Sequence, residues 1–357
     1  MNAKVVDYIL VGQGLAGSCL AVHLLQRKKS IAVFSAPALE SASRVAAGLF
    51  NPVTGKKLSL TWQADTLFPY LHTFYKEVER LTKDQFFFPM PVYRPFISAG
   101  EQNEWISKST ESPFASHVEV FNSPTFEEQV ANPFGGLLVK QSGYLDTSRF
   151  LSAVRAFIQS QGTFIEENLY GNELMVDRDG VEYRGLKANK IIFCEGTSAN
   201  FNKFFSWLPV EPLKGEVLQL KTDAVVPRIY NRGVYVVPGV WKAGATYNRF
   251  DKTAGPTLAA WQELTAGLES LIRFPYQVVE QLWGFRPTVP DRRPILGAHP
   301  ELSRLVIFNG FGTKGVSLAP YFANHLVCWL ENGQPLNNEV DIQRYKSVYW
   351  KSARNVI

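Results

Sequence analysis

Apolar and polar positions follow two different periods along the chain, and each period predicts a type of element. The run from Val5 to Val11 is apolar apart from Asp7 and Tyr8, which is typical of a buried strand. Apolar residues then recur at helical spacing from Leu15 to Leu25, and Ile31 to Phe34 forms a second short apolar run. The start of the chain therefore predicts a βαβ unit.

The rest of the chain contains further helical and strand-like stretches. We expect helices over 63–81, 147–160, 258–271 and 318–330, strands over 190–194 and 304–309, and several short strands between 217 and 247. Residues 86–97 alternate apolar residues with three prolines, which suits edge strands. Because the chain ends as it begins, with a strand, a glycine turn and a helix, we predict one domain built from both termini, with β-rich insertions between them.

The first strand runs directly into a GxGxxG turn, Gly12-Gln13-Gly14-Leu15-Ala16-Gly17. In such a turn Gly12 allows the tight bend, Gly14 lets the backbone approach a pyrophosphate, and Gly17 allows close packing of the following helix. The pyrophosphate then lies at the positive end of that helix. We therefore predict a dinucleotide site at the end of the first strand.

The second strand is followed by Ser35, where the dinucleotide fingerprint has an acid that binds the ribose 2′-hydroxyl. The serine hydroxyl could take this role itself. The missing acid is also compatible with a 2′-phosphate, as in NADP enzymes. A second backbone contact to the dinucleotide is predicted at Gly196, which closes the apolar run that starts at Lys190.

Composition narrows the class of protein. A chain of 357 residues with 46% hydrophobic and 19% charged residues is typical of a globular protein, and it is long enough for about two domains. The net charge of +5 is spread along the chain, without the basic run of a nucleic-acid-binding tail. The three cysteines and five histidines show no ligand spacing, so we expect neither a disulfide framework nor a metal site. The wide spacing of the cysteines fits a reducing cytoplasm best, and no apolar run is long enough for us to predict a membrane span.

The stretch from Trp283 to Gly297 holds the most distinctive candidate for chemistry. Arg286 lies between Phe285 and Pro287, and its planar guanidinium suits bidentate capture of a carboxylate. An intramolecular ion pair, for example with Asp291, explains the same residue equally well. The local sequence leaves both interpretations open.

Several segments, taken in order, resemble the D-amino acid oxidase and glycine oxidase family of FAD-dependent oxidoreductases. They are the GxGxxG turn, Val45–Leu49, Gly143–Asp146, Gly284–Pro287 and the Gly310–Gly315 turn. The resemblance spans the whole chain, favours FAD over NADP and implies a non-covalently bound FAD. It also implies an α/β fold in which a Rossmann-type FAD-binding domain (1–75, 143–205 and 285–357) carries a β-rich, α+β substrate-binding domain inserted in two segments (76–142 and 206–284).

The resemblance implies roles for individual residues. Arg286 stands where the family has its substrate-carboxylate arginine, and Tyr235 stands where the family has a tyrosine that reaches the substrate, with Tyr230 as a second candidate. Lys314 and the helix after it are expected to stabilise negative charge on the reduced flavin. The residues expected to contact FAD are Gly12, Gly14, Leu15, Ala16, Gly17, Ser35, Ser43, Arg44, Ala47, Gly48, Leu49, Gly196, Gly310, Gly312, Thr313, Lys314 and Gly315.

The activity implied is oxidation of the C–N bond of a primary or secondary α-amino acid, a small-molecule substrate, by hydride transfer to flavin N5 and hydrolysis of the imine. Three alternatives stay open. Thr313–Pro320 looks more like the oxidase half of the bacterial bifunctional enzyme that completes a wobble-uridine modification in tRNA, which would bring in a nucleic acid partner. The other two are an amino acid dehydrogenase with an acceptor other than oxygen and a non-catalytic nucleotide-binding module.

Overall fold

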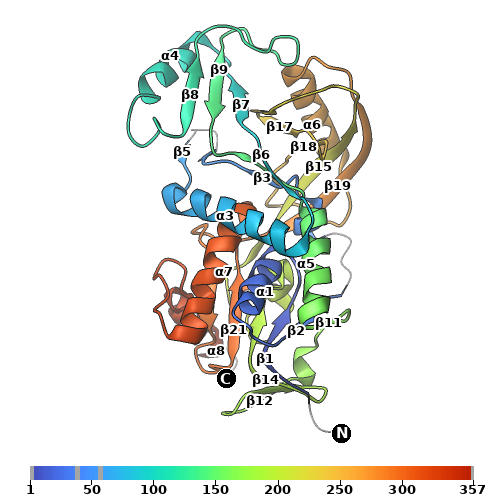
Figure 1. The fold of residues 1–357 in the computed structure, drawn as a ribbon, viewed down its shortest axis with the longest axis vertical. Helices are drawn as coiled ribbons and strands as arrows, with labels where there is room; N and C mark the ends of the chain where they lie inside the picture. Colours follow the sequence, from blue (N-terminus) through green and yellow to red (C-terminus); the bar gives the residue numbers. More distant parts are fainter. Residues whose placement is uncertain (1–3, 37–40, 55–58, 355–357) are drawn as a thin grey trace.

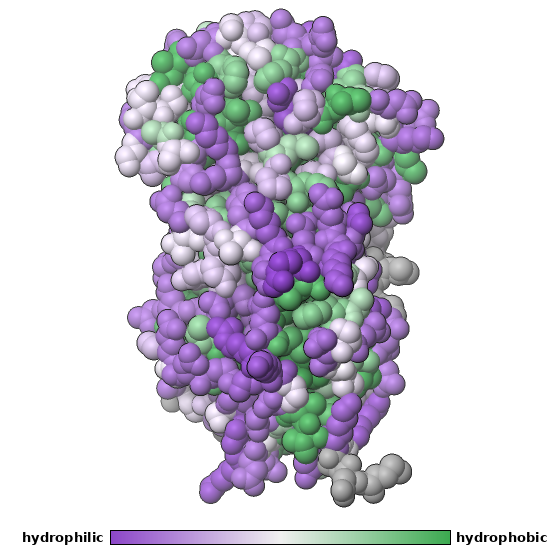
Figure 2. All heavy atoms as spheres, in the orientation of Figure 1, coloured by the Kyte–Doolittle hydropathy of each residue, from purple (hydrophilic) through white to green (hydrophobic). Residues whose placement is uncertain are grey.

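The computed structural model describes residues 4–36, 41–54 and 59–354. Figure 1 shows two lobes stacked along the long axis, each built on one large sheet. On the face drawn in Figure 2, hydrophilic side chains cover most of both lobes, and apolar side chains gather in smaller areas on each lobe. This distribution is expected of a globular protein whose large apolar side chains lie mostly in the interior.

The lower lobe in Figure 1 is built on a sheet with a parallel centre. β1 (Lys4–Val11) pairs in parallel with β2 (Ile31–Phe34) on one side and with β14 (Leu186–Phe193) on the other. The sheet continues with the parallel strands β11 (Thr163–Ile165) and β21 (Leu305–Asn309), and with the antiparallel strands β13 (Val181–Tyr183), β12 (Met175–Val176) and β20 (Ile295–Ala298). Strands from the start, middle and end of the chain therefore lie side by side.

Helices cover one face of this sheet. They are α1 (Leu15–Gln26), α3 (Ala64–Thr82), α5 (Thr147–Gln161) and α7 (Gly315–Asn332), and their buried residues share one core cluster with Tyr8 and Leu10 of β1. The opposite face packs against residues 204–210 and Ile342. The short elements η1 (Gly171–Glu173), η2 (Gly196–Phe201), η3 (Ile342–Tyr345) and α8 (Lys346–Arg354) complete this part of the chain. Because both faces are covered, the carboxyl ends of the central strands, residues 9–11 of β1 and 191–193 of β14, are apolar.

The upper lobe is built on a second sheet of eight strands. Their order is β19 (Gln277–Thr288), β15 (Glu211–Lys221), β18 (Lys242–Gly244), β17 (Val234–Val237), β16 (Ile229–Arg232), β7 (Val92–Pro95), β9 (Gly136–Val139) and β8 (Val118–Phe121). Helix α6 (Leu258–Leu271) packs against one face of this sheet through Leu264 and Leu268. Helix α4 (Ala99–Lys108) lies beside β8 and β9 in Figure 1.

Small elements join the two lobes. Helix α2 (Ala42–Val45) is followed by β3 (Leu49–Phe50), which pairs with β10 (Gly143–Leu145), and β10 pairs in turn with β6 (Phe87–Pro89). The hairpin of β4 (Val53–Thr54) and β5 (Ser59–Leu60) lies next along the chain. The segment from Ser41 to Thr54 therefore runs between the lobes, and Ser41 forms a bridge with Phe285 of β19.

Most predicted elements are present, and the exceptions have local causes. The edge position predicted within 86–97 is wrong for β7, which lies between β16 and β9. Pro91 precedes this strand and Pro95 ends it, so the missing N–H groups do not interrupt its ladder. Helix α7 begins earlier than expected, at Gly315. The α/β class with a β-rich part inserted in two segments is confirmed. The domain boundaries stay a prediction, and β19 crosses the one at 285.

Candidate active site

The glycine turn after β1 has the shape that a closely approaching phosphate requires. A Cβ atom at Gly17 would collide with the carbonyl oxygen of Gly12, and one at Gly12 would lie 2.6 Å from the carbonyl oxygen of Cys194. These two glycines let the turn pack tightly against α1 and β14. A Cβ atom at Gly14 would meet only the side chain of Ser43, with the hydroxyl oxygen 3.1 Å away. Gly14 is therefore the point where a ligand can come close to the backbone.

Two serines predicted to contact the cofactor lie at this turn. Helix α1 has Gly14 as its N-cap, so no N-cap side chain satisfies the N–H groups of its first turn. The Ser43 hydroxyl accepts a hydrogen bond from the Leu15 N–H at 3.1 Å. The Ser35 hydroxyl, just beyond β2, accepts one from the Gln13 N–H at 3.2 Å. The start of α1, which includes Ala16, thus faces both serine-bearing segments.

A buried lysine, which the sequence analysis missed, holds the segment that follows Ser43. Lys242 of β18 donates hydrogen bonds to the carbonyl oxygens of Arg44, Val45 and Ala46 at 3.2, 3.0 and 3.1 Å. Burial lowers the pKa of this ammonium group. Lys242 therefore ties the upper sheet to the end of α2, which is part of the predicted FAD segment.

The rest of that segment is fixed by close backbone packing. Gly48 has a φ of +72°, and a Cβ atom there would collide with the carbonyl oxygen of Leu145. The neighbouring Ala47 is 2% exposed, and Leu49 is half-buried in β3. Residues 47–49 therefore pack so closely that the backbone at Gly48 has room for a glycine only.

The glycine turn before α7 meets both the first turn and β19. The Gly312 N–H donates to the carbonyl oxygen of Pro287 at 2.9 Å, directly after Arg286. A Cβ atom at Gly315 would lie 3.3 Å from Leu15 Cδ1. The turns from the two ends of the chain are therefore neighbours, and the later one, with Gly310 and Thr313, lies at the end of the strand that carries Arg286.

Lys314 is the N-cap of α7, and its side chain is held in place by two hydroxyl groups. Its Nζ lies 3.1 Å from the Oγ1 atoms of both Thr54 and Thr61. Burial lowers the pKa of Lys314 to about 8, and the charges of Arg292 and Arg293 act in the same direction. This ammonium group can therefore lose its proton in a mildly alkaline solution.

A carboxylic acid lies beside the first glycine turn, because a Cβ atom at Gly12 would lie 3.5 Å from Glu195 Cα. Glu195 follows β14, and its Oε2 accepts a hydrogen bond from Asn202 Nδ2 at 2.7 Å. Burial raises the pKa of Glu195 to about 7. The next residue, Gly196, has a φ of +59° and nothing within 4 Å of the place where a Cβ atom would stand. The carbonyl oxygen of Gly196 accepts a hydrogen bond from Asn309 Nδ2 at 2.8 Å.

Arg286 lies across the neighbouring strand instead of pointing into solvent. A Cβ atom at Gly215 of β15 would collide with its guanidinium group, so this glycine makes room for it. Arg286 Nη1 donates to the carbonyl oxygen of Thr246 at 3.1 Å, and Cζ lies 4.9 Å from the ring centroid of Tyr247. Among the described residues no carboxylate forms an ion pair with Arg286. Asp291, the partner considered above, pairs with Arg344 at 2.9 Å.

Tyr235 lies on the same face of the upper sheet as the Arg286 guanidinium. Tyr235 pairs with Gly244, which pairs with Val217, and Val217 is two residues from Gly215 on β15. Because side chains alternate along a strand, these positions share one face. Val45 packs against the same face, together with Val217 and Tyr235. Arg286 and Tyr235 therefore face the segment predicted to hold the flavin.

Tyr230 is not brought to this face. It pairs with Val236, one residue away from Tyr235, so the two tyrosines point to opposite sides of the sheet. Its ring is fully buried in the core beneath α6, and its hydroxyl donates to Gln129 Oε1 at 2.6 Å. Only the register of β16 and β17 reveals this difference, so sequence spacing alone could not separate the two candidates.

The described residues fit a dinucleotide carrying a flavin. The open backbone at Gly14 and Gly196 suits a pyrophosphate and its neighbouring ribose, and the crowded glycines beside them suit only backbone. The turn at Gly312 is bonded to Pro287, the residue after Arg286, and Ser41, at the start of the segment that contains Gly48, bridges to Phe285, the residue before it. Within the described ranges no three His, Cys, Asp or Glu side chains are grouped to hold a metal ion.

Comparison with known proteins identifies the family. Residues 7–329 match the family model described as FAD dependent oxidoreductase (DAO). The chain belongs to this family. It is therefore an enzyme with FAD as its cofactor, and the predicted family and cofactor are confirmed, whereas the interpretation as a non-catalytic module is not.

Solved structures and curated relatives agree with this assignment. The iminodiacetate oxidase from Chelativorans sp. BNC1 superposes with a TM-score of 0.79 at 21% identity, covering 95% of this chain and 98% of that one. The glycine oxidase from Geobacillus kaustophilus gives 0.79 at 18% identity, covering 93% and 96%. The bifunctional protein ThiO/ThiG of Trichormus variabilis is 25% identical over 95% of this chain and 55% of its own length. The chain thus spans about half the length of the curated relatives that it matches over most of its own length.

Within 4–36, 41–54 and 59–354, none of the helices has the length and apolar character needed to cross a membrane.

Proposed function

We propose that the enzyme oxidises the C–N bond of a primary or secondary α-amino acid, giving an imine that hydrolyses. The single observation that carries the proposal is the Arg286 guanidinium, which no carboxylate of the described residues pairs with and which shares a sheet face with Tyr235 opposite the flavin segment. The names of two relatives, a glycine oxidase and an iminodiacetate oxidase, add support, because glycine is a primary and iminodiacetate a secondary amine with a carboxylate on the α-carbon.

Arg286 recognises the carboxylate of the substrate. One of its N–H groups is bound to the Thr246 carbonyl oxygen, which fixes the plane of the guanidinium and leaves the others for a bidentate pair with a carboxylate. The half-buried position strengthens this pair relative to one in water. The carboxylate then orients the α-carbon, and orientation of this kind supplies much of the catalysis in a hydride transfer.

Tyr235 holds the amine end of the substrate. Burial raises the pKa of its hydroxyl, although the Arg286 charge acts in the opposite direction, so the phenol stays protonated at neutral pH. A protonated phenol beside a guanidinium accepts or donates one hydrogen bond but does not carry a second charge. Bound FAD supplies the hydride acceptor. Lys314 and the start of α7 provide positive charge at the turn near Pro287.

The test is an anaerobic screen of amines and amino acids against the purified yellow protein, following the loss of flavin absorbance. The proposal predicts fast bleaching by an α-amino acid such as glycine or sarcosine and none by an amine of the same size without a carboxylate. Equally fast bleaching by amines with and without a carboxylate would contradict the role of Arg286. Peroxide release in air distinguishes an oxidase from a dehydrogenase with another acceptor.

The tRNA-modifying oxidase remains the second candidate, on the resemblance of Thr313–Pro320. Mass spectrometry of tRNA nucleosides from a deletion strain decides it, because unchanged wobble uridines would remove this candidate. The FAD contacts, the domain boundaries and the cytoplasmic location given above belong to the same proposal.

A further inference from the structure

Two charged side chains are buried in the strand that lies next to β19. Lys214 is 1% exposed and Glu216 is 2% exposed, and both belong to β15. Because side chains alternate, both point away from the face that carries Gly215 and Val217. They therefore lie behind the proposed substrate site, where charges are costly unless they are paired and hydrogen-bonded.

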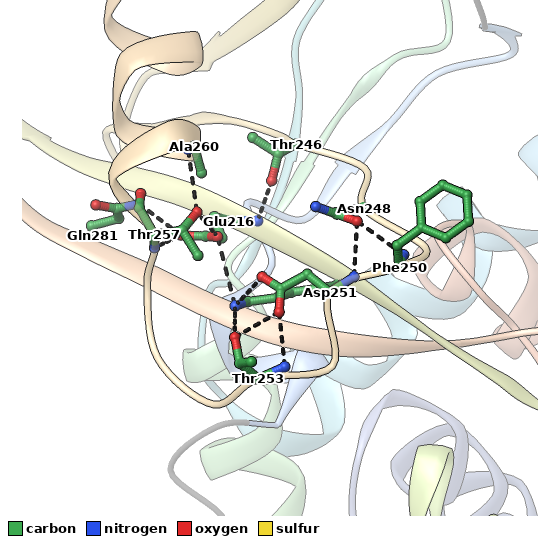
Figure 3. Close-up of polar contacts among 10 residues, drawn as sticks. Glu216, Thr246, Asn248, Phe250, Asp251, Thr253, Thr257, Ala260 and Gln281 are labelled. Atoms are coloured by element: carbon green, nitrogen blue, oxygen red, sulfur yellow. Dashed lines mark hydrogen bonds and ion pairs between the residues drawn. The ribbon is translucent and has the colours of Figure 1, made fainter.

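Lys214 and Glu216 lie 3.9 Å apart, and Gln281 of β19 donates to Glu216 at 2.6 Å. Their other charged and hydrogen-bonding partners come from one loop, residues 246–257, which joins β18 to α6 (Figure 3). Lys214 Nζ lies 2.7 Å from Asp251 Oδ2 and 3.4 Å from Thr253 Oγ1. Glu216 accepts hydrogen bonds from the Thr257 N–H and hydroxyl, both at 2.8 Å. The 246–257 loop is thus held from behind by one ion pair in its middle and two hydrogen bonds at its end.

The beginning of the same loop contacts Arg286. The Thr246 carbonyl oxygen accepts from Arg286 Nη1, and the Tyr247 ring lies over the guanidinium. The next residue, Asn248, exchanges backbone hydrogen bonds of 3.0 Å in both directions with Lys214. The loop therefore wraps around β15, with its first residues at Arg286 and its middle on the opposite face.

The backbone before Tyr247 is bonded to β15, because the Thr246 N–H donates to the carbonyl oxygen of Glu216 at 3.2 Å and the Glu216 N–H donates to Thr246 Oγ1 at 3.0 Å. Tyr247 itself is 64% exposed, and Phe250 at the outer part of the loop is 94% exposed. A ring this exposed is free to leave the guanidinium unless its backbone is fixed. The backbone is fixed at Asn248 and, through the ion pair, at Asp251. The Lys214 ammonium also holds the pKa of Asp251 at about 2, so this carboxylate stays charged over the whole working range of pH.

We propose that Asp251 is a positioning residue for substrate recognition: its pair with buried Lys214 fixes the 246–257 loop so that Tyr247 and the Thr246 carbonyl hold Arg286 ready for a carboxylate. This inference rests on the proposed function, because it takes Arg286 as the carboxylate-binding residue. It adds a remote ion pair, on the other face of the sheet, to the residues that determine the affinity for acids.

The test compares Asp251→Asn with wild type and with Asp84→Asn, which breaks a more exposed aspartate ion pair, with Arg149, in the other lobe. FAD-loaded proteins are titrated with acetate and with acetamide, which has the same shape without the charge, and flavin absorbance reports binding. We expect the acetate Kd of Asp251→Asn to rise about tenfold, with acetamide binding and FAD content unchanged. Asp84→Asn should match wild type. An acetate Kd within twofold of wild type would overturn the proposal.

Two further measurements keep the result decisive. Tyr247→Ala, at an exposed position, should give the same selective loss for acetate, and adding Asp251→Asn to it should cause no further loss, because both act through one loop. Effects that multiply would overturn the proposal. If Asp251→Asn does not fold, Thr253→Val, which removes the other contact of Lys214 Nζ to the loop, takes its place in the acetate titration. Hydrogen exchange of residues 248–253 should be faster in Asp251→Asn. If exchange is faster in Asp251→Asn but acetate does not change the flavin absorbance of the wild-type protein, the proposed function fails, whereas the role of Asp251 in fixing the loop is supported.

Discussion

The Nζ of Lys242 lies 3.0 Å from the carbonyl oxygen of Val45, and the same ammonium group also binds the carbonyl oxygens on either side. A strand of the upper sheet thereby holds the predicted flavin segment of the lower lobe. The two lobes are therefore coupled at the point where cofactor and substrate are proposed to meet.

The first prediction concerns this lysine. Lys242→Met removes the hydrogen bonds to three carbonyl groups, one of them fully buried, and should destabilise the fold by roughly 1–3 kcal/mol. It should also weaken FAD binding, because α2 loses its anchor. Urea unfolding and an FAD titration of the apoprotein measure the two effects. Lys187→Met, at an exposed lysine of β14, is the control. Unchanged FAD affinity in Lys242→Met would show that the anchor does not matter to the cofactor.

The second prediction concerns the open glycine of the first turn. In Gly14→Val the new side chain meets mainly the flexible Ser43 hydroxyl, so the protein should fold, but the methyl groups occupy the place where the pyrophosphate approaches. We expect purified Gly14→Val to be colourless, with an unfolding midpoint close to that of wild-type apoprotein. Gly100→Val in α4 is the control for the added bulk. A yellow Gly14→Val protein would place the pyrophosphate elsewhere.

The third prediction concerns pH and Glu195. Burial raises the pKa of this carboxyl from 4.5 to about 7, so the folded state binds more protons than the unfolded state between these values. Stability contributed by the protonated form is complete below about pH 4.5 and is lost as the pH rises to about 7. Glu195→Gln should therefore be more stable than wild type at pH 8, by up to about 3 kcal/mol, and equal to it near pH 4. Urea unfolding across this range is the measurement, and a difference that does not change with pH would refute the assignment.

The fourth prediction concerns Lys314. Its pKa is lowered from 10.5 to about 8, so the ammonium charge disappears as the pH rises through 8. If that charge stabilises reduced FAD, the midpoint potential of the bound flavin should fall more steeply above pH 8 than below it. Lys314→Met should show no such break and a lower potential at pH 7. Potentials measured against a reference dye test this, and identical curves for both proteins would remove Lys314 from the site.

Local sequence patterns predict those parts of the protein that depend on residues close together in the chain. The GxGxxG turn and the turn before α7 depend on glycines close together in the chain, and helical periods predict α3, α5 and α6 within a residue or two. Arg286 stands out in the sequence because Phe285 and Pro287 restrict it, but its role in binding a carboxylate comes from the family resemblance. These patterns can be interpreted without knowledge of the tertiary structure.

Other features depend on contacts between distant residues and could not be predicted. In the sequence, Lys242 looks like an ordinary surface lysine, because its hydrogen-bond partners are almost 200 residues away. Tyr230 and Tyr235 differ only through the register of two short strands. Lys214 and Glu216 did carry a signal, since they are two charges at alternate positions of one strand, share one face and are both buried. Their partner Asp251 lies in an irregular loop whose path no periodicity predicts.

The fifth prediction addresses the central claim, that Arg286 receives the carboxylate of an amino acid beside the flavin. The most direct measurement is the rate of anaerobic flavin bleaching by the best α-amino acid substrate in wild type, in Arg286→Ala and in Arg184→Ala, a control at an exposed ion-paired arginine. The account predicts that Arg286→Ala binds FAD normally but loses kcat/KM by a factor equivalent to roughly 2–5 kcal/mol, while Arg184→Ala matches wild type. Near-normal kcat/KM in Arg286→Ala, with FAD bound, would contradict it.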